Sequence, residues 1–246
     1  MLDTTLIHRR SDANIGDLAC TPGHYFDFGV QNMIAFGQES PACKRAILGG
    51  GQVYNDCVDA AIYHTSHAAL RIVWGVGISP KNVADFSFDI LEGSCALVSS
   101  RNWNVPRCEY VPCASAMSPL FDRGPAPTRD VVLFSHAKKS AALARYDGIP
   151  EMSNHSGSMA DAVAFLASGA TVVTNSFHGT YWAMCLGRKV LCLPFSHKFR
   201  QFKDNPVFGD PLNWRKSLHL AESRADVLHD ARARNVSFHE KVMNLT

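Results

Sequence analysis

The sequence predicts an α/β protein with a mostly parallel sheet. Short apolar runs alternate with helix-length patterns, and glycines separate them along all 246 residues. The composition is 46% hydrophobic and 19% charged, which is typical of a folded globular chain and excludes disordered, collagen-like and coiled-coil classes. The length suffices for one large domain or two small ones.

Eight apolar runs are candidate strands. They span residues 5–8, 46–48, 71–75, 96–99, 109–111, 131–135, 171–174 and 190–193. Between them, residues 123–129 contain two prolines and a glycine, a composition that favours a linker. We therefore expect an N-terminal lobe over 1–122 and a C-terminal lobe over 130–246. Helix formers dominate 218–245 and predict a long terminal helix, with Asn235 as the candidate break.

The second half has the clearest local signals. Ser158 followed by Asp161 resembles a capping box, and Gly169 supplies the helix stop before the strand TVVT. The polar turn NSFHG follows and leads into a short helix. This order places His178 at the carboxyl end of a strand and the start of a helix, where open α/β sheets bind ligands. Backbone N–H groups at such a helix start favour an anion.

Two glycine-containing segments have both structural and functional interpretations. Gly49, Gly50 and Gly51 end an apolar run and form either a tight turn or a ligand loop, and they match neither the G-x-G-x-x-G nor the P-loop pattern. Asn14-Ile15-Gly16-Asp17 follows the first strand. Asp17 is expected to cap a helix, to present a carboxylate at the sheet edge, or to do both.

Cationic residues follow two of the strands. Arg101 comes after ALVSS, and Lys198 and Arg200 come after VLCLPF. Each is either a solvated side chain or part of a pocket for carboxylate or phosphate groups. His64 and His67 share helical spacing, but no third ligand accompanies them, so no metal site is predicted.

Charge and cysteine usage limit the partners and the compartment. With 24 Lys and Arg against 22 Asp and Glu, the net charge of +2 gives no reason to expect nucleic-acid binding. The first ten residues lack the features of a secretory signal, and a cytoplasmic location is expected. Eight cysteines without a C-x-x-C pair favour buried thiols over zinc sites or disulfides.

The order of these motifs resembles that of the polysaccharide pyruvyltransferase family. Along the chain run NIGD, GGG, WGVGISP, a strand ending in arginine, VPCASAM, NSFHG, and a strand followed by K-x-R. The resemblance extends from about Asn14 to about Phe202. Its strongest stretch is TNSFHGTYWAMCLGRKVLCLPFSHKFRQF, residues 174–202.

The resemblance implies two Rossmann-like lobes in a GT-B-like arrangement, with a cleft between them. It implies transfer from phosphoenolpyruvate, without a cofactor, to a sugar of an exopolysaccharide or lipid-linked oligosaccharide, giving a pyruvate ketal. A lipid-linked acceptor would bring peripheral contact with the inner face of the membrane. By position, Arg101 and His178 are similar to donor-site residues, with Lys198 or Arg200 as the basic partner.

Residue chemistry assigns further roles within this resemblance. His178 is the expected general acid. Asp17 is the first candidate base, ahead of His136 and His24. The other expected substrate-binding residues are Asn14, Gly50, Gly51, Ser176 and Gly179.

The chain departs from the family in two respects. It is shorter than many members, and Asn102 stands after Arg101 where many relatives carry an acidic residue. Two alternatives remain open, a glycosyltransferase that uses a nucleotide sugar and a catalytically silent glycan-binding homologue. The stretch after His178 has no acidic residue until Asp204 to hold a ribose, which favours phosphoenolpyruvate.

Overall fold

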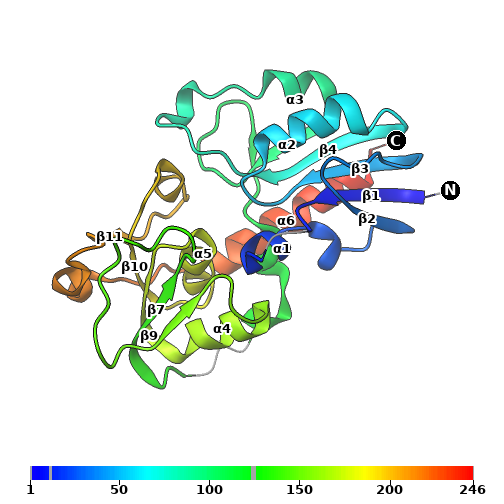
Figure 1. The fold of residues 1–246 in the computed structure, drawn as a ribbon. Helices are drawn as coiled ribbons and strands as arrows, with labels where there is room; N and C mark the ends of the chain where they lie inside the picture. Colours follow the sequence, from blue (N-terminus) through cyan, green and yellow to red (C-terminus); the bar gives the residue numbers. More distant parts are fainter. Residues whose placement is uncertain (1, 11–12, 123–125, 246) are drawn as a thin grey trace. The chain divides into compact units, whose positions relative to one another are not determined.

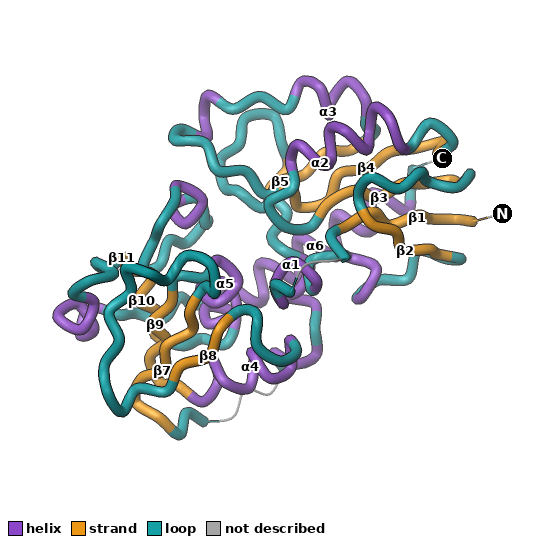
Figure 2. The backbone as a smooth tube through the Cα atoms, in the orientation of Figure 1, coloured by secondary structure: helices purple, strands orange, loops and turns teal. Residues whose placement is uncertain are grey.

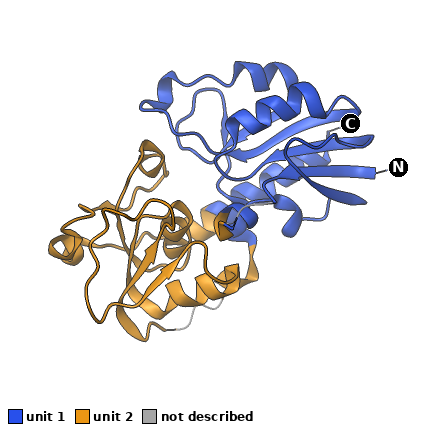
Figure 3. Ribbon diagram, in the orientation of Figure 1, with its two compact units in different colours: residues 1–13, 17–117, 231–246 blue, residues 14–16, 118–230 orange. Residues whose placement is uncertain are grey.

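Parallel strands form two separate sheets, one in each of two units, as the ribbon and tube views show (Figures 1 and 2). The computed structural model describes residues 2–10, 13–122 and 126–245. Unit 1 contains residues 1–13, 17–117 and 231–246, and unit 2 contains residues 14–16 and 118–230 (Figure 3). The predicted α/β class with two Rossmann-like units is confirmed. No helix among the described residues is long and apolar enough to span a membrane.

Unit 1 is built on a six-stranded parallel sheet with the order β2-β1-β3-β4-β5-β6. The strands are β1 (Leu2–His8), β2 (Gln31–Ala35), β3 (Cys43–Gly49), β4 (Ala68–Val76), β5 (Leu97–Ser100) and β6 (Glu109–Tyr110). Its helices are the C-terminal half of α1 (Ile15–Leu18), α2 (Tyr54–Asp59), which continues into a π-helical turn to His64, α3 (Asp89–Ser94) and the C-terminal part of α6 (Val227–Met243).

Both faces of the unit 1 sheet are buried. Successive residues of a strand point to opposite sides of the sheet, so each interior strand contributes to both cores. Ile7, Leu48 and Val73 belong to one core cluster, together with residues of α2 and α3. Their neighbours in sequence, Leu6, Ile47 and Ile72, belong to a second cluster with Trp74, Phe238 and Val242. This alternation explains why the interior strands read as continuous apolar runs.

Unit 2 is built on a five-stranded parallel sheet with the order β11-β10-β9-β7-β8. Its elements are β7 (Arg129–Ser135), β8 (Glu151–Ser153), α4 (Met159–Ser168), β9 (Gly169–Thr174), α5 (Phe177–Cys185), β10 (Lys189–Cys192) and β11 (Val207–Phe208). Ser158 and Asp161 form the predicted capping box of α4. Helices α4 and α5 pack on the sheet, and every residue of α5 is buried.

The observed division differs from the expected lobes at three segments. Residues 231–246 lie in unit 1, whereas residues 14–16 and 118–122 lie in unit 2. Part of the expected linker, residues 123–125, lies outside the described residues, and Arg129 already belongs to β7.

The predicted break of the terminal helix at Asn235 is wrong. Helix α6 is continuous because Asn235 is buried and fully bonded: its Oδ1 accepts from Trp74 Nε1 at 2.9 Å, and its Nδ2 donates to Pro112 O and Ala231 O.

Candidate functional site

The glycine triplet at the end of β3 lies at the carboxyl edge of the unit 1 sheet. Gly49, Gly50 and Gly51 have φ values of 131°, 80° and 90°, a region that favours glycine. A β-carbon on Gly50 would lie 2.6 Å from Cys20 Cβ, and one on Gly51 would lie 3.2 Å from Asp17 Oδ1. Gly50 and Gly51 therefore lie directly against residues 17–20, and Gly49 lies against the backbone of Trp74.

Asp17 is largely buried and lies within α1. The expectation that Asp17 caps this helix is wrong, since Asn14 Oδ1 accepts from Gly16 N at 3.2 Å. Asp17 Oδ2 instead lies 3.8 Å from Arg9 Nη1, and Arg9 Nη2 donates to Asp56 Oδ2 at 3.2 Å. Unit 1 thus brings Asp17, Gly50 and Gly51 together at one edge.

Arg101 is buried directly after β5, and its guanidinium packs against the backbone of Gly77, where a β-carbon would overlap it. Asn102 fixes the same loop. Its Oδ1 accepts from Ile78 N at 2.9 Å and its Nδ2 donates to Ile78 O at 3.1 Å. A carboxylate could make only the first of these two bonds, which gives a physical reason for an amide here.

Two buried thiols complete this edge of unit 1. Cys20 Sγ and Cys113 Sγ lie 3.5 Å apart, and none of the eight cysteines, all within the described residues, forms a disulfide. Burial raises the pKa of the Cys20 thiol well above its ordinary value, and Cys113 adds to this effect while Arg101 opposes it. Cys20 is therefore a neutral thiol at physiological pH, as the cysteine pattern predicts.

In unit 2, His178 lies in the first turn of α5, as the strand-turn-helix pattern predicts. It is buried against Gly16, where a β-carbon would overlap the imidazole ring. Ile15 N donates to Asn154 O at 3.0 Å, and Asn154 Nδ2 donates to Asn14 Oδ1 at 3.1 Å. These bonds hold the segment 14–16 in unit 2 and so fix one wall around His178.

Ser176 and Gly179 are paired with each other. Ser176 is the N-cap of α5, and its Oγ accepts from Gly179 N at 3.3 Å. The bond stabilises the helix start at which His178 lies.

Lys198 and Arg200 lie in the 3-10 turn His197–Arg200 after β10. Lys198 Nζ lies 5.2 Å from the centre of the Phe195 ring and 5.5 Å from that of Phe199. Phe199 in turn lies 6.3 Å from Phe177, the neighbour of His178. Lys198 and His178 therefore flank one aromatic cluster, whereas exposed Arg200 is placed over Phe208.

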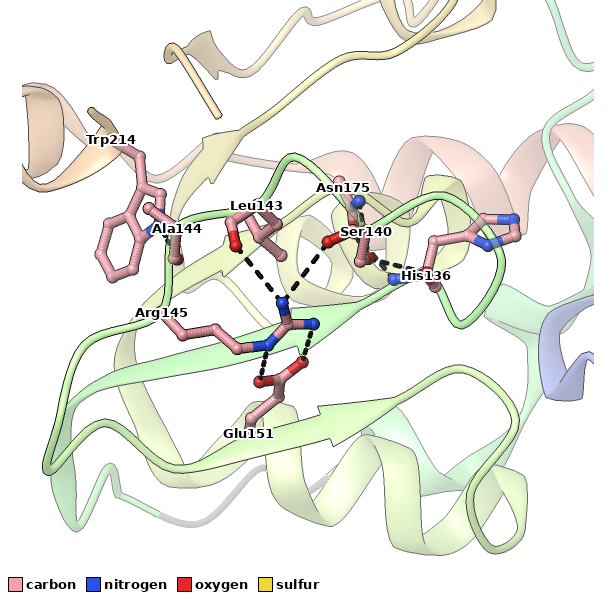
Figure 4. A network of polar contacts seen from close by, with 8 residues as sticks. All are labelled: His136, Ser140, Leu143, Ala144, Arg145, Glu151, Asn175 and Trp214. Atoms are coloured by element: carbon pink, nitrogen blue, oxygen red, sulfur yellow. Dashed lines mark hydrogen bonds and ion pairs between the residues drawn. The ribbon is translucent and has the colours of Figure 1, made fainter. Parts of the chain in front are cut away.

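His136 begins the loop after β7, which a polar network holds in place (Figure 4). His136 N donates to Asn175 Oδ1 at 2.7 Å, and Ser140 Oγ donates to His136 O at 2.7 Å. Arg145 Nη1 donates to Ser140 O at 3.4 Å, and two further Arg145 nitrogens donate to the carboxylate of Glu151. Burial raises the pKa of Glu151, but hydrogen bonds from Arg145 and Ser135 outweigh it and lower the pKa overall.

Sequence reasoning missed His155 and Asn154. The ring of His155 lies 6.5 Å from that of His136, and His136 lies edge-on to Phe195 at 5.4 Å. His136, His155 and Lys198 thus form a basic group at the carboxyl edge of the unit 2 sheet. His24, the third candidate base, lies in unit 1 and is exposed.

Comparisons with known proteins show a similarity of fold to solved structures. No family model and no curated protein sequence matches the chain. Among solved structures, the chain is similar to UDP-GlcNAc 2-epimerase from Neisseria meningitidis bound to UDP-GlcNAc. The TM-score is 0.46 and the identity is 7%, over 100% of this chain and 95% of that chain.

Proposed function

We propose that the protein is a pyruvyltransferase that moves the enolpyruvyl group of phosphoenolpyruvate onto two hydroxyls of a glycan sugar and releases phosphate. The observation that supports this best is the pairing of a buried, packed His178 with Lys198 across one aromatic cluster in unit 2. The pair offers a proton donor and a cation in the same unit, and this donor substrate requires both.

The residues match the charges of phosphoenolpyruvate, which carries a carboxylate and a phosphate. Lys198 is one cation for these groups, with His136 and His155 beside it on the same edge of unit 2. Arg101, in unit 1, is the second proposed anion clamp. Arg200 is the less suitable partner, because its guanidinium is placed over Phe208 and exposed.

In the proposed reaction, the first sugar oxygen bonds to the central carbon of phosphoenolpyruvate while His178 delivers a proton to the methylene carbon, which becomes a methyl group. Asp17, ahead of His136 and His24, accepts the hydroxyl proton. A second hydroxyl oxygen then bonds to the same carbon. The bond to the phosphate oxygen breaks, and phosphate leaves with the second hydroxyl proton.

Calorimetric titration of phosphoenolpyruvate without added metal tests the donor site. Lys198→Met should weaken binding about tenfold, because hydrogen bonds to charged groups contribute about 1.5–3 kcal/mol. Lys189→Met is the matched control, since Lys189 is exposed at the opposite end of strand β10 and should leave binding unchanged. Arg101→Ala should also weaken binding.

Turnover then tests His178. His178→Gln should lower kcat by about 10²–10⁴-fold while phosphoenolpyruvate still binds, because the substitution removes the acid. Saturable binding of uridine diphosphate or a UDP-sugar in place of phosphoenolpyruvate would instead identify a glycosyltransferase. No binding of any donor, or binding that Lys198→Met leaves intact, would contradict the proposal.

A further inference from the structure

Unit 1 contains a pocket of about 580 Å³ at the carboxyl ends of β1, β3 and β4. We call it the β3–β4 pocket. Its side walls are Arg9, Gln52, Tyr54, Asn55, Asp56 and Phe86, and the loop 77–80 closes it. The volume falls within the range of about 300–1,000 Å³ that is usual for small-molecule sites. The proposed reaction assigns no role to any of these six residues.

The charges of the pocket do not suit an anion. Arg9 is its one basic lining residue, and Asp56 and Asp17 lie 3.2 and 3.8 Å from the two terminal nitrogens of its guanidinium. Two carboxylates therefore already engage the guanidinium of Arg9, which leaves it poorly suited to bind a phosphate or carboxylate group. Nucleotides and phosphoenolpyruvate are disfavoured for this reason, so the ligand should be uncharged.

The remaining walls combine neutral polar groups with an aromatic face. Gln52 and Asn55 are exposed amides, and each offers hydrogen-bond donors and an acceptor. Tyr54 is held edge-to-face by Phe86 at 5.0 Å and by Phe88 at 5.4 Å. A sugar ring has hydroxyls around its edge and C–H groups on its faces, and it can use both kinds of wall.

We propose that the β3–β4 pocket binds a neutral sugar residue of a glycan. The identification of this sugar as the acceptor of the reaction rests on the proposed function, but the binding of a neutral sugar in this pocket does not. Arg9 connects the pocket to Asp17, the first candidate base. Gly77 of the closing loop covers the guanidinium of Arg101. A sugar held here would lie beside the two residues of unit 1 to which the proposed reaction assigns roles.

Nuclear magnetic resonance can locate this binding directly. The probes are the methyl glycosides of glucose, galactose, mannose and N-acetylglucosamine, titrated into ¹⁵N-labelled protein. At least one should shift the side-chain amide signals of Gln52 and Asn55 saturably. Asp56→Asn should weaken that binding about tenfold, because it removes a charged hydrogen-bond acceptor.

Asp59→Asn is the matched control, because it makes the same change on the same helix at an exposed residue outside the pocket wall. Its effect should stay within about twofold. Asn55→Ser is a second pocket variant at an exposed position and should also weaken binding. Thermal unfolding confirms that each variant is folded.

Three outcomes would overturn the inference: no probe shifts these amides, Asp56→Asn and Asp59→Asn behave alike, or inorganic phosphate saturates the same signals. The calorimetric titration of phosphoenolpyruvate separates this failure from that of the proposed function. Sugar binding without phosphoenolpyruvate binding would contradict the proposed function and support the sugar site in the pocket. Phosphoenolpyruvate binding without sugar binding would support the proposed function and contradict the sugar site.

Discussion

A single glycine sets part of the geometry of the unit 2 site. Gly16 matters because it has no β-carbon, which lets the backbone contact the His178 ring. Gly16→Ala should displace that ring, destabilise the protein by about 1–3 kcal/mol through overpacking, and lower kcat. Thermal unfolding and turnover measure the two effects.

Gly93→Ala is the control for this substitution, because Gly93 lies in α3 with open space around it. It should stabilise the protein by about 0.5–1 kcal/mol, as alanine does inside helices. Equal stability of the Gly16→Ala and Gly93→Ala variants would show that the contact with His178 is unimportant.

A buried histidine predicts the pH dependence of stability. His8 lies at the end of β1, its Nδ1 is 3.1 Å from Arg9 O, and its Nε2 has no hydrogen-bond partner within the described residues. Burial, and next the charge of His24, lowers the pKa of His8 from 6.5 to about 4. Between these values the unfolded chain binds a proton that the folded chain does not, so stability falls as the pH drops through this window.

The loss should reach at most about 3 kcal/mol in the native protein. Urea unfolding at about pH 7 and pH 4.5 measures it. In His8→Gln the difference between the two pH values should shrink, whereas His67→Gln, at an exposed residue, should leave it as in the native protein. An unchanged difference in His8→Gln would rule out His8 as the source.

The sequence could place some site residues and not others, for reasons that depend on distance along the chain. The position of His178 follows from a strand, a turn and a helix that are adjacent in sequence. Asn14 lies far from His178 in sequence. No local pattern predicts that Asn154 donates a hydrogen bond to Asn14. His155 and Asn154 were missed because they follow β8, a strand that was itself missed.

At the scale of elements, all eight predicted strands are present, and the missed ones share one property. Strands β2, β8 and β11 are three of the four edge strands of the two sheets, and only the fourth, β6, was predicted. An edge strand pairs on one side only and is partly exposed, so it does not need a continuous apolar run. Interior parallel strands are covered on both faces, and their composition therefore reveals them.

Helix α6 shows the opposite limit. Its buried residues are Ala231, Asn235, Phe238 and Val242. Judged from the sequence alone, the polar Asn235 suggested that the helix is broken there. The amide of Asn235 is bonded to Trp74 and Pro112, residues far away in the chain. Only a tertiary partner makes a buried asparagine compatible with a continuous helix.

At the scale of the whole molecule, each unit has its own sheet and core, and unit 1 depends on the C-terminal part of α6. Phe238 is fully buried and packs edge-to-face on Trp74 at 4.8 Å. Phe238→Ala should destabilise unit 1 by about 3–5 kcal/mol. Hydrogen exchange followed by mass spectrometry should show faster exchange in β1, β3 and β4, with β7 and β9 unchanged.

Val236→Ala changes the same helix at a residue that is 40% exposed and should alter neither unit. Equal acceleration of exchange in both units of the Phe238→Ala protein would mean that the two units unfold as one cooperative body, contrary to this expectation.

The order in which the segments of unit 1 occur has a consequence for synthesis on the ribosome. All the strands of unit 1 emerge before any strand of unit 2, but residues 231–246 emerge after all of them. The apolar face of the unit 1 sheet that Phe238 and Val242 cover therefore stays exposed while the strands of unit 2 are translated. Unit 2 can complete its core first, so the N-terminal unit of this chain is the later one to fold. A nascent chain halted before residue 231 should consequently need a chaperone.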